Sequence, residues 1–133
     1  MLLQIDHHSG VPIYRQVMDQ IRWQVMTGQL PEGEQLASVR DLAGQLKVNP
    51  MTISKAYALL EVEGLLERRR GVGLFVAVIR KDQRRHTKTQ LLEQILTKAV
   101  ATAVQFDISP EEVHELTKRL FEKHGSKIGS EGE

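Results

Sequence analysis

The sequence of 133 residues contains no cysteine, which excludes a disulfide framework and thiol chemistry. Long apolar runs are also absent, and none is close to the length that a membrane-spanning helix needs. Residues 1–10 lack both the basic residues and the continuous apolar stretch of a signal peptide. These absences predict a cytoplasmic protein with no membrane partner, and the length predicts one domain or one domain with an appendage.

The usual signs of catalysis and metal binding are missing as well. No glycine-rich phosphate loop precedes a predicted helix, and no pair of carboxylates is placed for acid–base chemistry. The five histidines are scattered without the spacing of metal ligands. Ser38 has no histidine near it in the sequence, so a helix cap is a better interpretation than a nucleophile. We expect neither an enzyme nor a cofactor or metal site.

The net charge is only +1, but the charged residues are unevenly distributed. Residues 66–88 contain eight basic and two acidic side chains, which gives +6. Residues 106–133 contain four basic and seven acidic side chains, which gives −3. Because nucleic acids attract basic surfaces, this asymmetry predicts that the first region faces DNA and that the C-terminal end faces away from it.

The N-terminal region predicts an amphipathic helix over about residues 11–27, preceded by a short extended arm at residues 2–6. Pro12 suits the first helical turn and Gly28 ends the helix. Trp23 lies off the centre of the apolar stripe and is expected at its edge. The stripe consists of Ile13, Tyr14, Val17, Met18, Ile21 and Val25. This helix is the expected scaffold for the elements that follow.

Residues 38–64 have the pattern of two short helices joined by a tight turn. Ser38 with Asp41 forms a capping-box pattern at the start of the first helix. Pro50 prevents that helix from continuing, while Asn49 as N-cap and Pro50 at the first position begin the next one. Gly64 can end the second helix in the left-handed conformation. This arrangement predicts a helix-turn-helix, with Tyr57 in its core.

A basic hairpin follows the two helices. Two strand-like runs flank the turn Gly71-Val72-Gly73, and the arginines at 68–70 stand just before that turn. A solvated hairpin face is the alternative interpretation of the arginines, but their place after a helix-turn-helix favours contact with DNA. Residues 1–79 are therefore predicted to form a winged helix-turn-helix domain.

These motifs resemble the GntR superfamily of bacterial transcription regulators over residues 10–79. The matching landmarks are Pro12-Ile13-Tyr14, residues 28–33, Ser38-x-Arg40-x-Leu42-Ala43, residues 52–57 and Arg69-Arg70-Gly71-x-Gly73-x-Phe75-Val76. Leu74 departs from the pattern, since many relatives have threonine there. The short remainder resembles the YtrA-type branch, whose C-terminal part is a pair of dimerising helices.

The C-terminal region, residues 80–125, is predicted to contain a linker and a two-helix dimerisation segment. Residues 80–88 are polar and basic, which indicates a linker or a weakly anchored helix start. Apolar residues then recur at helical spacing until Asp107, and Ser109 with Pro110 begins a second helix that ends at Gly125. Because two such helices bury little core by themselves, a symmetric homodimer is favoured over an intramolecular seam. The predicted dimerisation residues are Leu92, Leu96, Ala99, Ala103, Phe106, Leu116 and Leu120. Residues 126–133 are predicted to be a disordered tail.

The N-terminal residues of the second helix of a helix-turn-helix meet base edges in the major groove. The family pattern implies contacts there and at Arg40, whose guanidinium can bind guanine bidentately. In the hairpin, Arg69 and Arg70 are expected to bind the phosphate backbone, while Gly71 and Gly73 let the turn approach a groove. The predicted contacts in and before the second helix are Asn49, Pro50, Met51, Thr52, Ser54 and Lys55.

The sequence therefore predicts a mostly α-helical protein with a small β wing, acting as a dimeric, sequence-specific DNA-binding repressor on a palindromic operator. The family resemblance implies that operators of this branch often control transporter genes, commonly of the ABC type. An unknown small-molecule effector is a further partner to expect, in a cleft between the dimerising helices and the wings. The alternatives are a winged helix that binds another protein and a module that binds DNA non-specifically.

Overall fold

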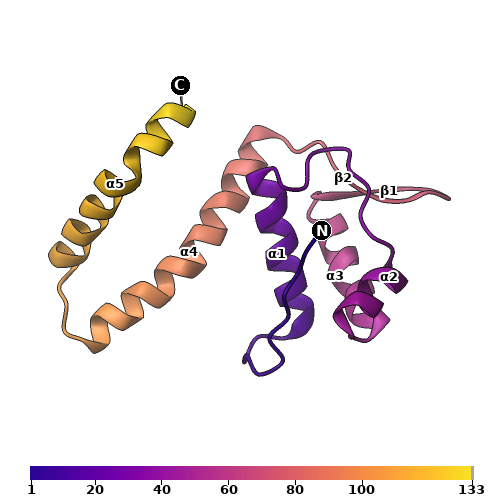
Figure 1. Cartoon of the computed structure of the whole chain (residues 1–133), viewed down its shortest axis with the longest axis horizontal. Helices are drawn as coiled ribbons and strands as arrows, with labels where there is room; N and C mark the ends of the chain where they lie inside the picture. The colour runs from indigo at the N-terminus through magenta and orange to yellow at the C-terminus, as the bar shows by residue number, and fades with distance from the viewer. Residues whose placement is uncertain (133) are drawn as a thin grey trace. The chain divides into compact units, whose positions relative to one another are not determined.

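The computed structural model describes residues 1–132, with side chains described for residues 1–125. Its elements are α1 (Ile13–Thr27), α2 (Val39–Leu46), α3 (Pro50–Val62), β1 (Leu66–Arg69), β2 (Gly73–Val76), α4 (Lys81–Gln105) and α5 (Pro110–Gly132) (Figure 1). The predicted fold class, mostly α with a small β wing, is confirmed. The chain divides into two compact units, Met1–Leu91 and Leu92–Glu133. None of the described helices is both long enough and apolar enough to cross a membrane.

The core of the first unit lies where α1, α2 and α3 meet. Side chains that are almost fully buried come from each helix and from the base of the hairpin: Val17, Ile21, Leu42, Ile53, Leu60, Leu65 and Val76. Tyr57 is also buried, as its spacing predicted. Trp23 is 48% exposed, which places it at the edge of the stripe, as the pattern indicated. Burial of these apolar side chains is the main stabilising term for the unit.

The caps predicted from the sequence define the helix-turn-helix. The Ser38 hydroxyl accepts a hydrogen bond from the Asp41 amide at 3.0 Å, and the Asn49 Oδ1 atom accepts one from the Met51 amide at 2.8 Å. Pro50 occupies the first position of α3. Gly64 has a φ of +84°, the left-handed conformation expected just after the helix. The turn between α2 and α3 also uses Lys47, which adopts the left-handed conformation without being glycine.

The start of α1 differs slightly from the prediction. Pro12 is the N-cap rather than part of the first turn, so the helix begins at Ile13. The carbonyl of Pro12 nevertheless accepts the Gln16 amide at 3.1 Å. The predicted N-terminal arm lies along α1, held by side-chain amides. Gln20 both accepts from the Gln4 amide at 2.8 Å and donates to the Gln4 carbonyl at 2.6 Å.

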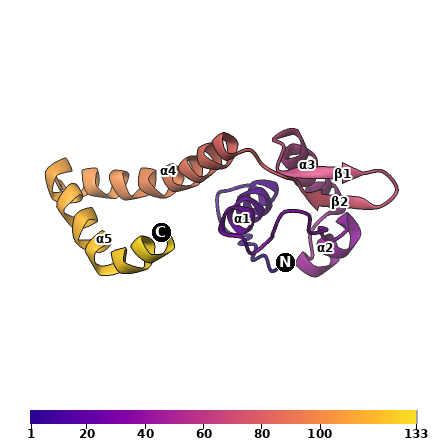
Figure 2. The same ribbon diagram turned by 90° about the horizontal axis from the view of Figure 1, so that it is seen from above.

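The wing is an antiparallel pair in which Leu66 faces Val76 and Arg69 faces Gly73. Its β2 edge is covered by the segment that precedes α2. The Leu36 amide donates to the Leu74 carbonyl and the Val76 amide donates to the Glu34 carbonyl, each at 2.8 Å. In both views, the turn of the wing and the first turn of α4 lie at opposite ends of the first unit (Figures 1 and 2).

The first turns of α4 belong to the first unit and contact it through polar bonds and a buried leucine. Residues 81–88 are helical, so of the two interpretations of this segment the helix start is the observed one. Arg84 pairs with Glu32 at 3.0 Å, the Gln83 amide donates to the Glu63 carbonyl, and Leu91 is buried. Polar bonds and the buried Leu91 side chain hold this segment on the first unit, and the strength of the anchoring stays a prediction.

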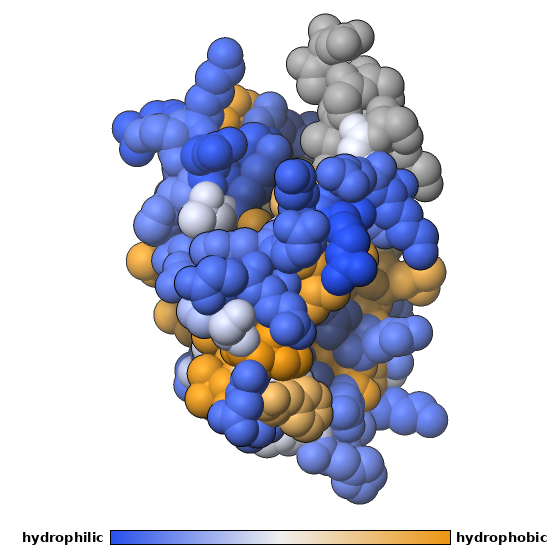
Figure 3. Space-filling model, turned by 90° about the vertical axis from the view of Figure 1, so that its left-hand side faces the viewer, coloured by the Kyte–Doolittle hydropathy of each residue, from blue (hydrophilic) through white to orange (hydrophobic). Residues whose placement is uncertain are grey.

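In the second unit, α4 and α5 meet at a turn. Asp107 adopts a left-handed conformation and the Ile108 amide donates to the Ala103 carbonyl at 2.9 Å. The Ser109 hydroxyl accepts the Glu112 amide at 3.2 Å, which confirms the predicted cap of α5. Figure 3 shows orange apolar side chains between hydrophilic ones on the face seen there. Large apolar residues of both helices are exposed: Leu92, Ile95, Leu96, Val100, Val104, Phe106, Leu116, Leu120 and Phe121.

The end of α5 differs from the prediction. The helix continues past Gly125 to Gly132, because one glycine in a helix costs only about 1 kcal/mol and does not by itself end it. The tail predicted at 126–133 includes Glu133, which lies outside the described residues, and residues 126–132, of which only the backbone is described.

Candidate nucleic-acid interface

The start of α3 presents a free face to solvent. Ile53, Ala56 and Tyr57 are buried, and this burial orients the intervening residues outward. Met51 is 77% exposed, Ser54 and Lys55 are exposed, and Thr52 is half-buried. A large apolar side chain that is so exposed at a helix N-terminus is suited to contact with an apolar group such as a thymine methyl. The predicted contact residues at 49–55 therefore lie together on one surface.

Lys55 is held over an aromatic ring. Its ammonium group lies 4.0 Å from the centre of the Tyr14 ring, which belongs to α1. A cation over the face of an aromatic ring is attracted by the ring quadrupole. Tyr14 thus restricts the positions that the ammonium group occupies, and the pairing was not predicted, because 41 residues separate the two positions.

Arg40 is exposed in the first turn of α2. The Ser38 cap determines where α2 begins, and so the direction in which the Arg40 side chain projects from the helix. Among the described residues, no carboxylate forms an ion pair with Arg40, Lys55 or Arg70. These three cations are therefore available to an external anion.

The three arginines of the hairpin have different surroundings. Arg68 pairs with Glu61 of α3 at 3.2 Å, so its charge is partly used within the protein. The Arg69 guanidinium stacks 4.0 Å from the centre of the Phe75 ring. Arg70 lies in the turn, where Gly71 has a φ of +75° that other residues rarely adopt. Of the three hairpin arginines, only Arg68 forms an ion pair with a carboxylate among the described residues. Arg69 and Arg70, the two predicted phosphate contacts, do not.

The positive charge of residues 66–88 is divided between two places. The hairpin carries Arg68, Arg69 and Arg70, while Arg80, Lys81, Arg84, Arg85 and Lys88 lie at or near the start of α4. These two places lie at opposite ends of the unit, so the basic residues do not form one continuous group, and which of them face DNA stays a prediction (Figures 1 and 2). The chain returns from the hairpin to bury Ile79 and Leu91 in the core, which separates the two groups.

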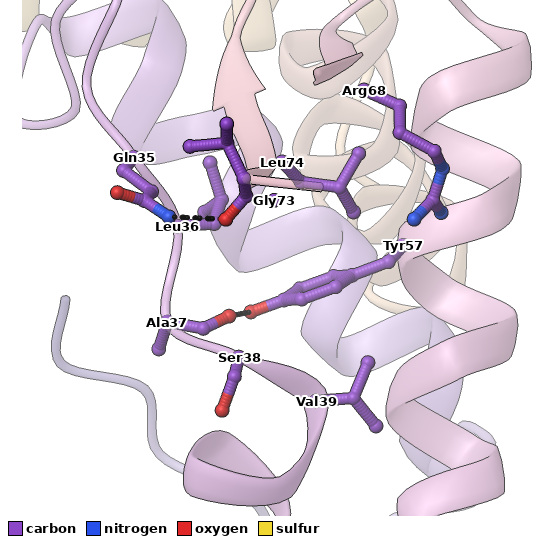
Figure 4. A pocket seen from close by; sticks show the side chains of 10 residues that line it. Gln35, Leu36, Ala37, Ser38, Val39, Tyr57, Arg68, Gly73 and Leu74 are labelled. Carbon is purple, nitrogen blue, oxygen red and sulfur yellow. Dashed lines mark hydrogen bonds between the residues drawn. The ribbon is translucent and has the colours of Figure 1, made fainter. Parts of the chain in front are cut away.

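A cavity of about 210 Å³ separates the wing from the start of α2 (Figure 4). At its wall, the Tyr57 hydroxyl donates to the Ala37 carbonyl at 2.8 Å. Burial raises the pKa of Tyr57, so the phenol keeps its proton and remains a donor at neutral pH. The cavity is lined by Gln35, Leu36, Ala37, Ser38, Val39, Tyr57, Arg68, Val72, Gly73 and Leu74.

Sequence reasoning missed the residues that support this surface. Tyr14 and Phe75 hold cations, and Gln35 bonds to the turn of the wing with its side-chain amide 3.0 Å from the Val72 carbonyl. Tyr14 and Phe75 stand among the family landmarks, which is the one signal that pointed to them. No pattern in the sequence pointed to Gln35.

The arrangement is that of known transcription regulators. Residues 13–76 match the family model described as bacterial regulatory proteins, gntR family. The HTH-type transcriptional repressor YtrA of Bacillus subtilis is 34% identical over 90% of this chain and 92% of its own length. A GntR family transcriptional regulator from Listeria monocytogenes has a TM-score of 0.71 and 30% identity, covering 86% of this chain and 98% of that one.

A third structure is the AraR DNA-binding domain in complex with operator ORX1. It has a TM-score of 0.51 and 28% identity, and covers 58% of this chain and 96% of that chain. The matching relatives are transcription regulators and not enzymes. The winged helix-turn-helix, the two-helix C-terminal part and the near full-length match to YtrA lead to one conclusion: this chain belongs to the GntR family, in its YtrA-type branch.

Proposed function

We propose that this chain is a transcription repressor that binds a palindromic DNA operator as a homodimer. The observation that carries the proposal is the exposure of three cations that no carboxylate of the described residues pairs with: Arg40 in α2, Lys55 in α3 and Arg70 in the turn of the wing. In a helix-turn-helix the start of the second helix enters the major groove, while the cations reach bases and phosphates. The solved complex of the AraR domain with its operator supports the same use of the fold.

The roles of the individual residues follow from their chemistry. Arg40 presents a planar donor pair suited to guanine, and Met51 an apolar group suited to thymine. Thr52 and Ser54 have hydroxyls that bond to a base or a phosphate. Lys55, Arg69 and Arg70 supply charge to the phosphate backbone, and Gly71 and Gly73 leave room for close approach.

Dimerisation is proposed from the apolar surface of the second unit. Leu96 is 46% exposed and Phe106 is 69% exposed, in a unit of two helices that bury little core themselves. Ala103 is the exception among the predicted dimerisation residues, because it is buried within the protomer. A second copy presenting the same face would cover the others by two-fold symmetry, and the paired recognition helices would then read an inverted repeat.

The genes under control are proposed to encode transporters, commonly of the ABC type, as the resemblance to the YtrA-type branch implies. Mapping the chain's binding sites across the genome of its source organism tests this. Sites upstream of transporter genes are expected. Enrichment at promoters of unrelated enzymes, with none at transporter genes, would remove this part of the proposal.

Selection of binding sites from random duplex DNA tests the function itself, followed by titration of the selected site at two salt concentrations. We expect an inverted repeat, bound by two protomers, with affinity that falls steeply as salt rises. Binding without an enriched sequence would instead indicate a non-specific DNA-binding module. Absence of binding even at low salt would favour a winged helix that contacts another protein.

A further inference from the structure

Gln35 joins the turn of the wing to the segment that leads into α2. Its side-chain amide donates to the Val72 carbonyl at 3.0 Å (Figure 4). Within the described residues, this is the hydrogen bond that connects the turn at 70–72 to a residue outside the hairpin. Gln35 itself is held in place, because its neighbours Glu34 and Leu36 both bond to the backbone of β2.

The Gln35 amide lies close to Gly73, the second glycine of the wing. A Cβ atom on Gly73 would lie 2.8 Å from the Gln35 Nε2 atom, so the end of the flexible Gln35 side chain would have to shift away from its present place. Gly73 also has a φ of +141°, in the region that favours glycine. The backbone conformation therefore favours glycine at position 73, and a larger residue there would also displace the Gln35 amide from its present position.

Packing supports the turn of the wing only weakly on this side. The cavity of about 210 Å³ between Val72–Leu74 and the start of α2 is partly open to solvent. Val72 at the turn is itself 61% exposed. The Gln35 bond thus lies at the wall of this cavity, beside an exposed turn.

We propose that Gln35 is a positioning residue for DNA binding, which holds the turn of the wing at a set place relative to α2 and α3. The inference rests on the proposed function, because the position of the wing affects DNA binding only if Arg69 and Arg70 contact the DNA at the same time as Arg40. Gln35 stands three residues before the Ser38 cap, so one short segment connects the wing turn to the helix that carries Arg40. A wing that is ordered beforehand loses less conformational entropy on binding.

The test compares Gln35→Met, which keeps the length of the side chain but removes the donor, with the wild type on the selected operator. We expect Gln35→Met to bind about 3- to 10-fold more weakly, the range for loss of one hydrogen bond. Gln35→Glu places an acceptor against the Val72 carbonyl and should weaken binding at least as much. Gln29→Met is the matched control, because Gln29 is an exposed glutamine in the loop after α1.

A double-mutant cycle with Arg70→Ala separates positioning from a general loss of structure. Arg70→Ala should weaken binding clearly in the wild type but little in the Gln35→Met background, because the wing there is already misplaced. The salt dependence should become shallower in the same variants, since fewer counterions are released. The inference would be overturned if Gln35→Met bound the operator as tightly as the wild type, or if Arg70→Ala lowered the affinity equally in both backgrounds.

Amide hydrogen exchange provides a readout that needs no DNA. The Val72 amide donates to the Arg69 carbonyl at 3.0 Å within the turn. In Gln35→Met this amide should exchange several-fold faster, while the core amides of α3 keep their rates. Unchanged exchange at Val72 contradicts the role of Gln35, whereas absence of DNA binding by the wild type contradicts the proposed function, so the two failures are distinct.

Discussion

The ammonium group of Lys55 in α3 lies 4.0 Å from the centre of the Tyr14 ring in α1. The ring belongs to α1, whereas Lys55 lies on the exposed face of α3. The pair connects the core to the surface that we propose meets DNA. Lys55 is thus partly ordered beforehand, which lowers the entropic cost of the phosphate contact that we propose for it.

Replacing Tyr14 by Leu should weaken binding to specific and random DNA alike by about 2- to 5-fold, the range for an exposed cation–π contact. Tyr14→Phe keeps the ring face and should bind like the wild type. Titrations of both variants on both kinds of DNA check this. In a Lys55→Ala background the Tyr14→Leu effect should vanish, and its full persistence there would show that Tyr14 acts through something other than Lys55.

Arg40→Ala should lower the affinity for the operator by about 1–3 kcal/mol and relax the base preference at one position of each half-site. The reason is that a bidentate contact to guanine carries sequence information, whereas a phosphate contact does not. Lys55→Ala is the comparison, since it should weaken all sequences similarly. Binding-site selection with each variant measures the preference. An equal loss on operator and random DNA for Arg40→Ala would assign that residue to the phosphate backbone instead.

Local features of the chain could be predicted from the sequence because they depend on neighbouring residues. Ser38, Asn49 and Ser109 cap helices through amides two or three positions away, and Gly64 adopts the left-handed conformation that its place after α3 required. The helix-turn-helix and the hairpin follow from these signals and from the apolar periodicity.

The supporting contacts could not be predicted, because they join residues far apart in the chain. Gln35 bonds to Val72 and Arg84 pairs with Glu32, with no periodic pattern linking either pair. Polar side chains that hold backbone segments look the same in a sequence as solvated ones. The two basic groups in 66–88 illustrate this limit, since summed charge does not reveal which end of the unit each group occupies.

The Tyr57 hydroxyl contributes stability that depends on pH. Burial raises the pKa of Tyr57 above its ordinary value of 10.0, so the folded chain holds the phenol proton more tightly than the unfolded chain. The contribution is therefore complete below pH 10 and is lost as the pH rises toward the folded-state pKa. Tyr57→Phe should cost about 1 kcal/mol at pH 8, from loss of the bond to Ala37. Urea unfolding of both proteins between pH 8 and 11 should show this difference shrinking, and parallel curves would contradict it.

The anchor of α4 should be modestly stabilising. The Glu32 carboxylate accepts from Arg84 at 3.0 Å and from the Ile79 amide at 3.2 Å. Because both side chains are partly exposed, Arg84→Met should lower the free energy of unfolding by no more than about 1 kcal/mol, and less in high salt. Arg85→Met, at an exposed neighbouring position, is the control. A loss that is the same at 50 mM and 1 M salt would indicate that packing of the arginine stem, rather than charge, is responsible.

Substitution of Leu96 and Leu120 tests the proposed dimer. Both are exposed in the protomer, and an aspartate at either position would place a charge in an apolar interface, where burying it unpaired is costly. We expect the wild type to sediment at twice the protomer mass of 15.1 kDa, and the double variant Leu96→Asp, Leu120→Asp to sediment at that mass. The variant should bind an inverted repeat no better than a single half-site. Val78→Asp alters an apolar residue of the first unit that is even more exposed, and it should leave the dimer intact. A wild type that sediments as a monomer and still prefers the full repeat would place dimerisation on the DNA rather than in solution.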